Sequence, residues 1–396
     1  MDLRCFLLTR RQVNYSFRVN YTKIIIYCQQ KYDIMLFVNI MINGKVDMGY
    51  LLELQNLRDA APDMINYLLL GISEAITIVG ILIAAYIYWC TSKRAGAYIL
   101  ACFSGGYMLN QIIKNTACIY RPWVADPRIH LAEAAAGSAT GYSFPSGHTL
   151  SATAVYGGAA IYRNKNKIFV AFMSLMIVLT AFARNWLGAH TLLDVSVAIL
   201  EGIAVLIFNA LVINWLVKKD ESYAGMPDAE KKSLRNRTIL MIIGLVFIIV
   251  AMIYLVLKPY PMDYDEAGNI LADPYEMITD CYTGAGMFSG FLIGWFIEKR
   301  FIDYHLPKKA SERGYIFFYG FAGIAILYIA LMPFITAPLN EHAEHFLKYF
   351  AVFFWVTGGY PALIKWQRKR YRKIEPEEPV TGSGTWRRGS DSDILN

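Results

Sequence analysis

Apolar runs of about 20 residues recur along the chain and are separated by short polar or charged stretches. A helix needs roughly 20 residues to cross a bilayer, so each run predicts a transmembrane helix. The expected spans are residues 64–90, 96–113, 146–162, 168–183, 189–217, 238–257, 278–298, 315–335 and 346–364. This pattern predicts an all-α fold, a polytopic transmembrane helical bundle.

The segments that flank these spans have a different character. Between residues 48 and 63, Leu51, Leu54 and Leu57 recur at helical spacing among polar residues, which favours an amphipathic helix on the membrane surface. Residues 366–396 are basic and then rich in Pro, Glu, Gly and Ser, which predicts a disordered cytoplasmic tail.

Residues 1–47 are polar and basic. Charged side chains interrupt the apolar residues between positions 24 and 42, and charges at bilayer depth are unfavourable. We interpret residues 1–47 as a poorly ordered or mis-assigned N-terminal extension, because Met48 looks like a more natural start. The alternative is that residues 24–42 form a tenth span.

Composition agrees with an integral membrane protein and excludes several other classes. Charged residues make up 17% of the chain and hydrophobic ones 56%, with a mean hydropathy of +0.35. The net charge of +7 is concentrated in short connections, so it does not indicate nucleic-acid binding. The six cysteines show no paired spacing, which argues against a disulfide framework or a zinc site.

The same charges predict an orientation. Basic residues follow the first, third, fifth, seventh and ninth spans, including the hydrophilic loop 218–237, whereas the stretches 263–280 and 341–344 are acidic. By the positive-inside rule, the basic connections are cytoplasmic. The candidate site residues described next then all lie at the outer, extracytoplasmic face.

Three groups of polar residues stand at the ends of apolar runs. Ser146 precedes a helix whose first N–H groups can bind an anion, and Gly147 allows close approach of that anion, with His148 beside it. An ordinary capped helix with a histidine at its start is the alternative reading.

His190 and Asp194 are four residues apart at the start of the fifth span, so they share one helix face. The carboxylate can hold one imidazole nitrogen and leave the other as a nucleophile. The alternative is a pair that only joins two helices.

Lys114, Arg121 and Arg184 supply three cations at the same membrane face. Arginine grips phosphate oxygens through two parallel hydrogen bonds, and lysine adds a point charge. Each alone could contact lipid headgroups, but together with two histidines they favour a phosphoryl-transfer site.

The combined pattern is Lys114, Arg121-Pro122, Pro145-Ser146-Gly147-His148, Arg184, His190 and Asp194. It resembles the type 2 phosphatidic acid phosphatase family, which shares its pocket with vanadium-dependent haloperoxidases. The resemblance covers about residues 50–216 and implies a phosphatase core of five to six spans within residues 48–217. Residues 238–365 are more weakly similar to the extra four spans of some bacterial members. The family usually has Ser where this chain has Ala183.

The resemblance implies a role for each matching residue. His190 attacks phosphorus and becomes phosphohistidine, Asp194 orients its ring, and His148 protonates the leaving oxygen and then activates water. Phosphate is held by Lys114, Arg121, Ser146, Gly147 and Arg184. No metal or cofactor is implied.

These inferences predict a membrane lipid phosphatase acting on phosphatidic acid, phosphatidylglycerol phosphate or undecaprenyl diphosphate. A lipid phosphotransferase and a non-catalytic lipid-phosphate binder or transporter are the alternatives. Ala183 favours the binder, whereas the intact histidine–aspartate pair favours an enzyme. Glu74 and Glu201, inside predicted spans, are either functional or form helix-to-helix hydrogen bonds.

Overall fold

The structure is a computed structural model that describes residues 48–265 and 267–374. The interpretations of residues 1–47 and of the tail beyond residue 374 therefore lie outside the described residues. The described part of the chain forms helices, with one isolated bridge between Tyr264 and Ile270 as its β-type pairing. The predicted all-α fold is confirmed.

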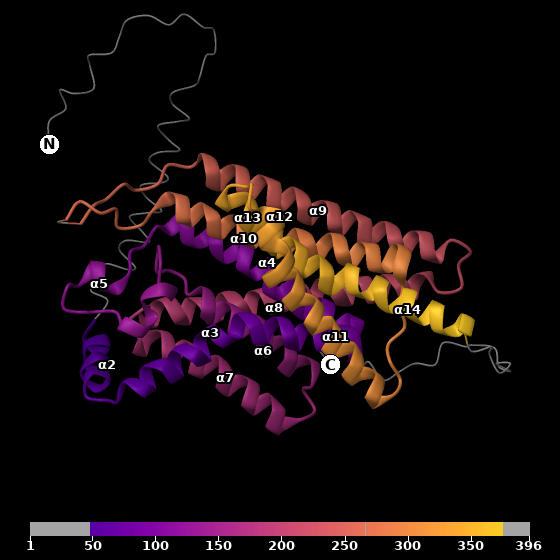
Figure 1. Ribbon diagram of the computed structural model, residues 1–396, viewed down its shortest axis with the longest axis horizontal. Coiled ribbons are helices and arrows are strands. Elements are labelled where there is room, and N and C mark those ends of the chain that lie inside the picture. Colours follow the sequence, from indigo (N-terminus) through magenta and orange to yellow (C-terminus); the bar gives the residue numbers. More distant parts are fainter. Residues whose placement is uncertain (1–47, 266, 375–396) are drawn as a thin grey trace, which may run out of the picture. The chain divides into compact units, whose positions relative to one another are not determined.

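The first half of this helical bundle alternates long helices with short connections (Figure 1). A short helix α2 precedes α3, which continues into the π-helical turn η2; α5 and the 3-10 turn η3 lie in the connection between α4 and α6. The bounds are α2 Gly49–Asp59, α3 Asp63–Tyr86, η2 Ile87–Thr91, α4 Lys93–Ala117, α5 Pro122–Ala125, η3 Glu133–Ser138, α6 Gly147–Tyr162, α7 Lys167–Trp186 and α8 Leu192–Tyr223.

The second half adds helices that are interrupted more often. Three π-helical turns, η4, η5 and η6, extend or link its helices. The bounds are α9 Ala229–Leu257, α10 Pro274–Ile297, η4 Glu298–Ile302, α11 Ala310–Ala325, η5 Ile326–Leu331, α12 Met332–Thr336, α13 Glu341–Phe354, η6 Trp355–Gly359 and α14 Tyr360–Ile374.

Every predicted span coincides with a helix, but the helices differ in how well they suit lipid. Within the described residues, five helical segments are long and apolar enough to cross a membrane: Lys167–Trp186, Leu192–Tyr223, Ala229–Leu257, Ala310–Thr336 and Glu341–Arg370. A sixth is the pair Asp63–Ile76 and Ile78–Thr91 if this segment, bent by 42°, counts as one span. The chain is thus a polytopic helical bundle, and the count of nine spans stays a prediction.

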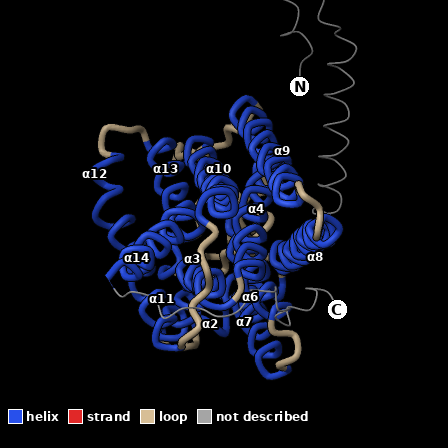
Figure 2. The backbone as a smooth tube through the Cα atoms, turned by 90° about the vertical axis from the view of Figure 1, so that its right-hand side faces the viewer, coloured by secondary structure: helices blue, strands red, loops and turns tan. Residues whose placement is uncertain are grey.

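The helices outside that set include α4, which lies in the interior. Figure 2 looks nearly along the bundle and places α4 between α10, α8 and α6. Its buried residues include Ser104, Gly106 and Asn110. Small and polar side chains allow close approach and hydrogen bonding between helices but offer little to lipid, which explains this central position.

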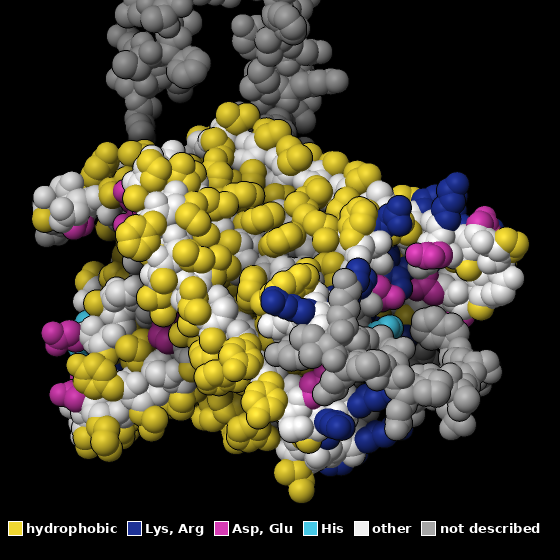
Figure 3. Space-filling view, turned by 45° about the vertical axis from the view of Figure 1, so that its right-hand side comes forward, with side chains coloured by type: hydrophobic (Ala, Val, Ile, Leu, Met, Phe, Trp, Pro, Cys, Tyr) yellow, Lys and Arg dark blue, Asp and Glu magenta, His cyan; other side chains and the backbone are white. Residues whose placement is uncertain are grey.

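Apolar side chains cover the outside of the bundle. Figure 3 shows a broad hydrophobic belt, with Lys and Arg side chains gathered toward one end of that face. Helix α9 contributes the exposed side chains of Ile239, Ile242, Ile243, Val246, Ile249, Val250 and Ile253. Such a surface fits contact with lipid chains.

Helix α10 has a glycine at every fourth position, Gly286, Gly290 and Gly294, and this stripe packs against α13 and η6. A Cβ atom added at Gly286 would lie 2.3 Å from the Phe346 carbonyl oxygen, and one at Gly290 would lie 2.4 Å from that of Phe350. Only glycine fits such backbone-to-backbone contact, so these residues set the distance between the two helices.

Candidate active site

The candidate residues lie where helices end at one end of the bundle, the end that carries α5 in Figure 1. Lys114 is in the last turn of α4, which stops at Cys118 in the left-handed conformation (φ 52°). Arg121 directly precedes α5, and Arg184 is in the last turn of α7. Because neighbouring helices run in opposite directions, these ends meet although 70 residues separate the first from the last.

His190 lies in the turn between α7 and α8, and one side of its ring faces Asp194. Its Nδ1 is 3.6 Å from Asp194 Oδ2 and 3.4 Å from Ser143 Oγ, while Ser143 donates a 2.6 Å hydrogen bond to that same carboxylate oxygen. The contact with Asp194 is therefore longer than an ordinary hydrogen bond, and Ser143 supplies the shorter hydrogen-bonded route. All three residues are buried.

Asp194 also has a structural task. Its Oδ2 accepts the Thr191 N–H at 2.7 Å, while Thr191 Oγ1 accepts the Asp194 N–H at 3.2 Å, which makes a capping box at the start of α8. The capping box fixes the carboxylate close to the imidazole.

The other side of the His190 ring faces Arg121. Arg121 Nη1 lies 3.0 Å from His190 Nε2 and donates to the Ala189 carbonyl at 2.9 Å. A guanidinium can only donate, so Nε2 must be the acceptor and the ring proton sits on Nδ1. The nitrogen lone pair available for nucleophilic attack is therefore the one that Arg121 contacts.

Arg184 and His148 share a partner. Glu74 Oε1, from α3, is 3.2 Å from Arg184 Nη1 and 3.1 Å from His148 Nε2. Arg184 also donates to the hydroxyl and the carbonyl of Ser138, at 3.2 and 3.1 Å. Its Nε has no hydrogen-bond partner among the described residues, although it is buried.

A single connection, residues 138–143, contacts both arginines and the aspartate. Besides the contacts of Ser138 and Ser143, the carbonyls of Thr140 and Gly141 accept hydrogen bonds from Arg121 Nη2 and Nε at 2.6 and 3.0 Å. This connection fixes the distance between the two guanidinium groups.

The predicted cap at the start of α6 is confirmed: Ser146 Oγ accepts the Thr149 N–H at 3.4 Å. A Cβ atom added at Gly147 would lie 4.0 Å from Lys114 Nζ, so the lysine points at this helix start. Lys114 is buried, and within the described residues its ammonium makes no ion pair or hydrogen bond. Asp280 and Asp194 act on this buried ammonium through their charge only, so its N–H groups remain available to an incoming anion.

The cations act on one another and on the nucleophile candidate. Burial, with the charges of Arg121, Arg184, Lys114 and His148, holds the pKa of His190 well below its usual value. Burial and the charge of Arg184 lower the pKa of Arg121 to about 9. The site therefore places a neutral imidazole among three cations, which suits an incoming anion, and Glu74, Asp194 and Asp280 offset part of their charge.

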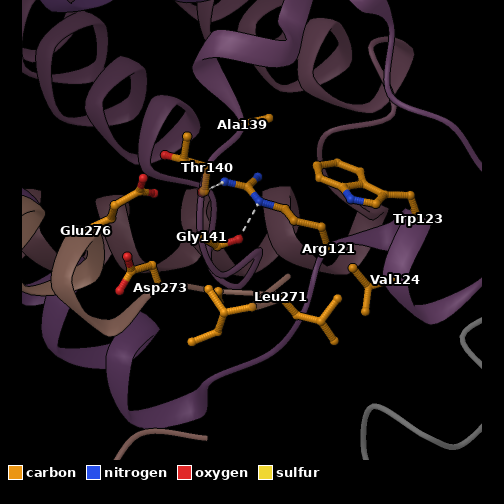
Figure 4. Close-up of a pocket in the computed structure, with 11 residues that line it drawn as sticks. Arg121, Trp123, Val124, Ala139, Thr140, Gly141, Leu271, Asp273 and Glu276 are labelled. Atoms are coloured by element: carbon orange, nitrogen blue, oxygen red, sulfur yellow. Dashed lines mark hydrogen bonds between the residues drawn. The ribbon is translucent and has the colours of Figure 1, made fainter. Parts of the chain in front are cut away.

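A cavity of about 300 Å³ opens beside Arg121 (Figure 4). One wall comes from Trp123 and residues 139–141, and the other from residues 270–273 and Glu276 of the second half. In Figure 4 the Arg121 guanidinium points toward Thr140 and Gly141, with Asp273 and Glu276 nearby. The two halves of the chain thus both line the approach to this arginine.

The sequence did not reveal every residue of this site. Ser143 and Ser138 belong to a connection without a recognisable signal, and two of the acceptors there are backbone carbonyls. Glu74 could be singled out in the sequence as a carboxylate inside an apolar run, but the sequence did not show that it contacts His148 and Arg184. Glu201 accepts a 3.0 Å hydrogen bond from Asn110 Nδ2, the helix-to-helix contact that was the second reading for it.

The described residues contain no group of three or more His, Cys, Asp or Glu side chains placed to hold a metal ion.

Comparisons with known proteins give two matches. Residues 94–221 match the PAP2 superfamily, and residues 282–370 match a region described as the transmembrane extension of PAP2 superfamily phosphatases. The comparison with curated proteins and the comparison with solved structures each found no match. The first match contains all the candidate residues, and the second begins within α10.

Proposed function

The chain belongs to the PAP2 superfamily and is a multi-pass membrane phosphatase, and from this premise we propose that it hydrolyses a lipid phosphate through a phosphohistidine. The supporting observation is the setting of His190, with Nε2 against Arg121 and Nδ1 against Ser143 and Asp194. A cation held at the nucleophilic nitrogen can pass its N–H to a phosphate oxygen, which brings phosphorus to that nitrogen.

The first chemical step joins His190 Nε2 to phosphorus. The nitrogen lone pair forms the P–N bond, the P–O bond to the lipid breaks, and the lipid oxygen keeps that electron pair and takes a proton from His148. Lys114, Arg121 and Arg184, with the N–H groups at Ser146 and Gly147, stabilise the charge on the equatorial oxygens.

The second step releases phosphate. His148 takes a proton from water, the water oxygen bonds to phosphorus, and the electron pair of the P–N bond returns to His190. Protein cations supply the charge stabilisation, so the reaction needs no metal. An alcohol in place of water would make the same chain a phosphotransferase.

The division of labour along the chain is part of the proposal. We assign catalysis to residues 48–217, a cytoplasmic position to the loop 218–237, and additional spans to residues 238–365. Basic connections at the opposite end support an active site on the outer face of the cell membrane.

The test uses the purified full-length protein with phosphatidic acid, phosphatidylglycerol phosphate and undecaprenyl diphosphate in EDTA. We expect inorganic phosphate from at least one of them, an acid-labile phosphoenzyme, and loss of both in His190→Ala. His130→Ala is the matched control, because His130 also lies 3.4 Å from an aspartate, Asp59, but both side chains are exposed. Turnover that disappears on chelation would exclude the metal-free reaction.

Release of phosphate by His190→Ala at the wild-type rate would remove the assigned nucleophile. Adding glycerol as an acceptor separates hydrolysis from transfer, since a phosphotransferase would form glycerol phosphate. Sidedness is tested with p-nitrophenyl phosphate outside sealed vesicles: right-side-out vesicles should hydrolyse it and inside-out vesicles should not.

A further inference from the structure

Glu74 is an acidic residue in the middle of α3, where a carboxylate is unfavourable unless it has partners. It has two, and both belong to the candidate site. A single oxygen, Oε1, is 3.1 Å from His148 Nε2 and 3.2 Å from Arg184 Nη1. Both distances are short enough for charge-assisted hydrogen bonds.

The contact with His148 parallels the contact between Asp194 and His190. In each pair, one ring nitrogen faces a carboxylate, Nε2 in His148 and Nδ1 in His190, which leaves the other nitrogen for chemistry. The two pairs differ in exposure: the side chain of His148 is 22% exposed, against 2% for His190. His148 therefore lies nearer to the space from which a leaving group departs.

We propose that Glu74 is the positioning residue for the leaving-group step, and the inference rests on the proposed phosphatase reaction. Glu74 holds the His148 ring by Nε2, so that Nδ1 faces the substrate, and offsets the charge of the ring while it carries the proton. In the first step that proton moves from Nδ1 to the lipid oxygen as the P–O bond breaks.

A carboxylate that also contacts Arg184 could act in a different way, by setting the phosphate-binding arginine. The two roles have different kinetic signatures. In the first step, support of the general acid matters only when the leaving oxygen needs a proton, whereas support of Arg184 matters for every phosphate ester and for phosphate analogues. The ratio kcat/KM reports this first step and does not include the later attack of water, in which His148 serves all substrates alike. A comparison of leaving groups therefore separates them.

The experiment compares full-length wild type and Glu74→Gln on a lipid phosphate and on p-nitrophenyl phosphate, whose leaving group departs without a proton. We expect kcat/KM on the lipid phosphate to fall about 100-fold, in the range of general-acid effects, and kcat/KM on p-nitrophenyl phosphate to change by less than about 3-fold. The inhibition constant of orthovanadate, which has no leaving group, should stay within about 2-fold, because the phosphate site is intact.

Two further variants keep the test independent of folding. Glu74→Asp retains the charge and should show the same preference for p-nitrophenyl phosphate to a smaller degree. In a His148→Ala background, Glu74→Gln should produce no additional loss, because its effect passes through that ring. Glu201→Gln is the control, because the Glu201 carboxylate is buried and accepts a hydrogen bond from Asn110 and not from a histidine, and it should change both substrates by one common factor.

Three outcomes would overturn the inference. They are equal losses of activity on both substrates in Glu74→Gln, weaker inhibition of that variant by orthovanadate, and an additional loss of activity in the His148→Ala background. A fourth is unchanged turnover of the lipid phosphate. Failure of the proposed function looks different, because then the wild type itself releases no phosphate from any lipid.

Discussion

Ser143 Oγ lies 2.6 Å from Asp194 Oδ2 and 3.4 Å from His190 Nδ1, so the hydroxyl stands between the carboxylate and the imidazole. The hydroxyl donates to the carboxylate and can accept the Nδ1 proton. The tautomer that leaves Nε2 unprotonated is thus fixed partly through a serine, and the direct contact between Asp194 and His190 is the longer one, 3.6 Å.

Ser143→Ala should lower kcat by about 10-fold and leave KM nearly unchanged. The reason is the loss of one hydrogen bond, worth about 1–1.5 kcal/mol, on the ring and not on the phosphate. Steady-state kinetics with p-nitrophenyl phosphate would measure it. Ser104→Ala is the control, because the Ser104 hydroxyl is also buried but bonds to Leu100 of its own helix. A selective rise in KM would contradict this role of Ser143.

The lowered pKa of His190 predicts how the free energy of unfolding depends on pH. Its pKa is held well below the usual value near 6.5, so the unfolded chain binds a proton there before the folded chain does. This contribution to stability is complete above pH 6.5 and declines below it, by up to about 1.4 kcal/mol per pH unit. The unfolding temperature of the wild type should therefore fall more between pH 7.5 and 5.5 than that of His190→Gln. Equal slopes for the two proteins would contradict the burial of a neutral ring.

Gly286→Ala should destabilise the contact between α10 and α13. The added methyl group would lie 2.3 Å from the Phe346 carbonyl, so one backbone must move, at a cost of about 1–3 kcal/mol. Thermal unfolding in detergent measures this. Gly314→Ala, in α11, is the matched control because nothing lies within 4 Å of the added atom, and that change should be neutral or stabilising. A neutral Gly286→Ala would mean that the helices are not in close contact.

Ala183→Ser should tighten the binding of phosphate analogues. The family usually carries a hydroxyl at this position, directly before Arg184, and one more hydrogen bond to a phosphate oxygen is worth about 1 kcal/mol, or about 5-fold in affinity. Inhibition by orthovanadate is the measurement. Ala181→Ser, two residues earlier in α7 and also buried, is the control. A weaker inhibition in Ala183→Ser than in wild type would indicate that the hydroxyl has no access to the anion.

The positions of the helices could be predicted from the sequence because apolar runs and their ends are local signals. The boundaries of α6 and α7 in the structure lie within a few residues of those expected, at Gly147–Tyr162 and Lys167–Trp186. Because successive spans run in opposite directions, the sequence alone also predicts that Lys114, Arg184 and the start of α6 lie at one end of the bundle.

The remaining contacts depend on packing between distant segments, which no local pattern encodes. The contact between Glu74 and His148 joins α3 to α6, and it depends on how those helices are rotated against each other. The hydrogen bonds of Ser143 depend on the path of an irregular connection. The small and polar residues of α4 agree with its interior position, but which helices surround it follows from tertiary packing.

Arg121 is held by the peptide oxygens of Thr140 and Gly141, whereas the Thr140 side chain is exposed and borders the cavity. The backbone of Thr140 therefore anchors Arg121, and its side chain lines the cavity. A substitution at Thr140 can therefore change the size and polarity of this cavity while both backbone hydrogen bonds to Arg121 remain. The lining of the cavity can therefore vary between related sequences without a change in the position of the Arg121 guanidinium.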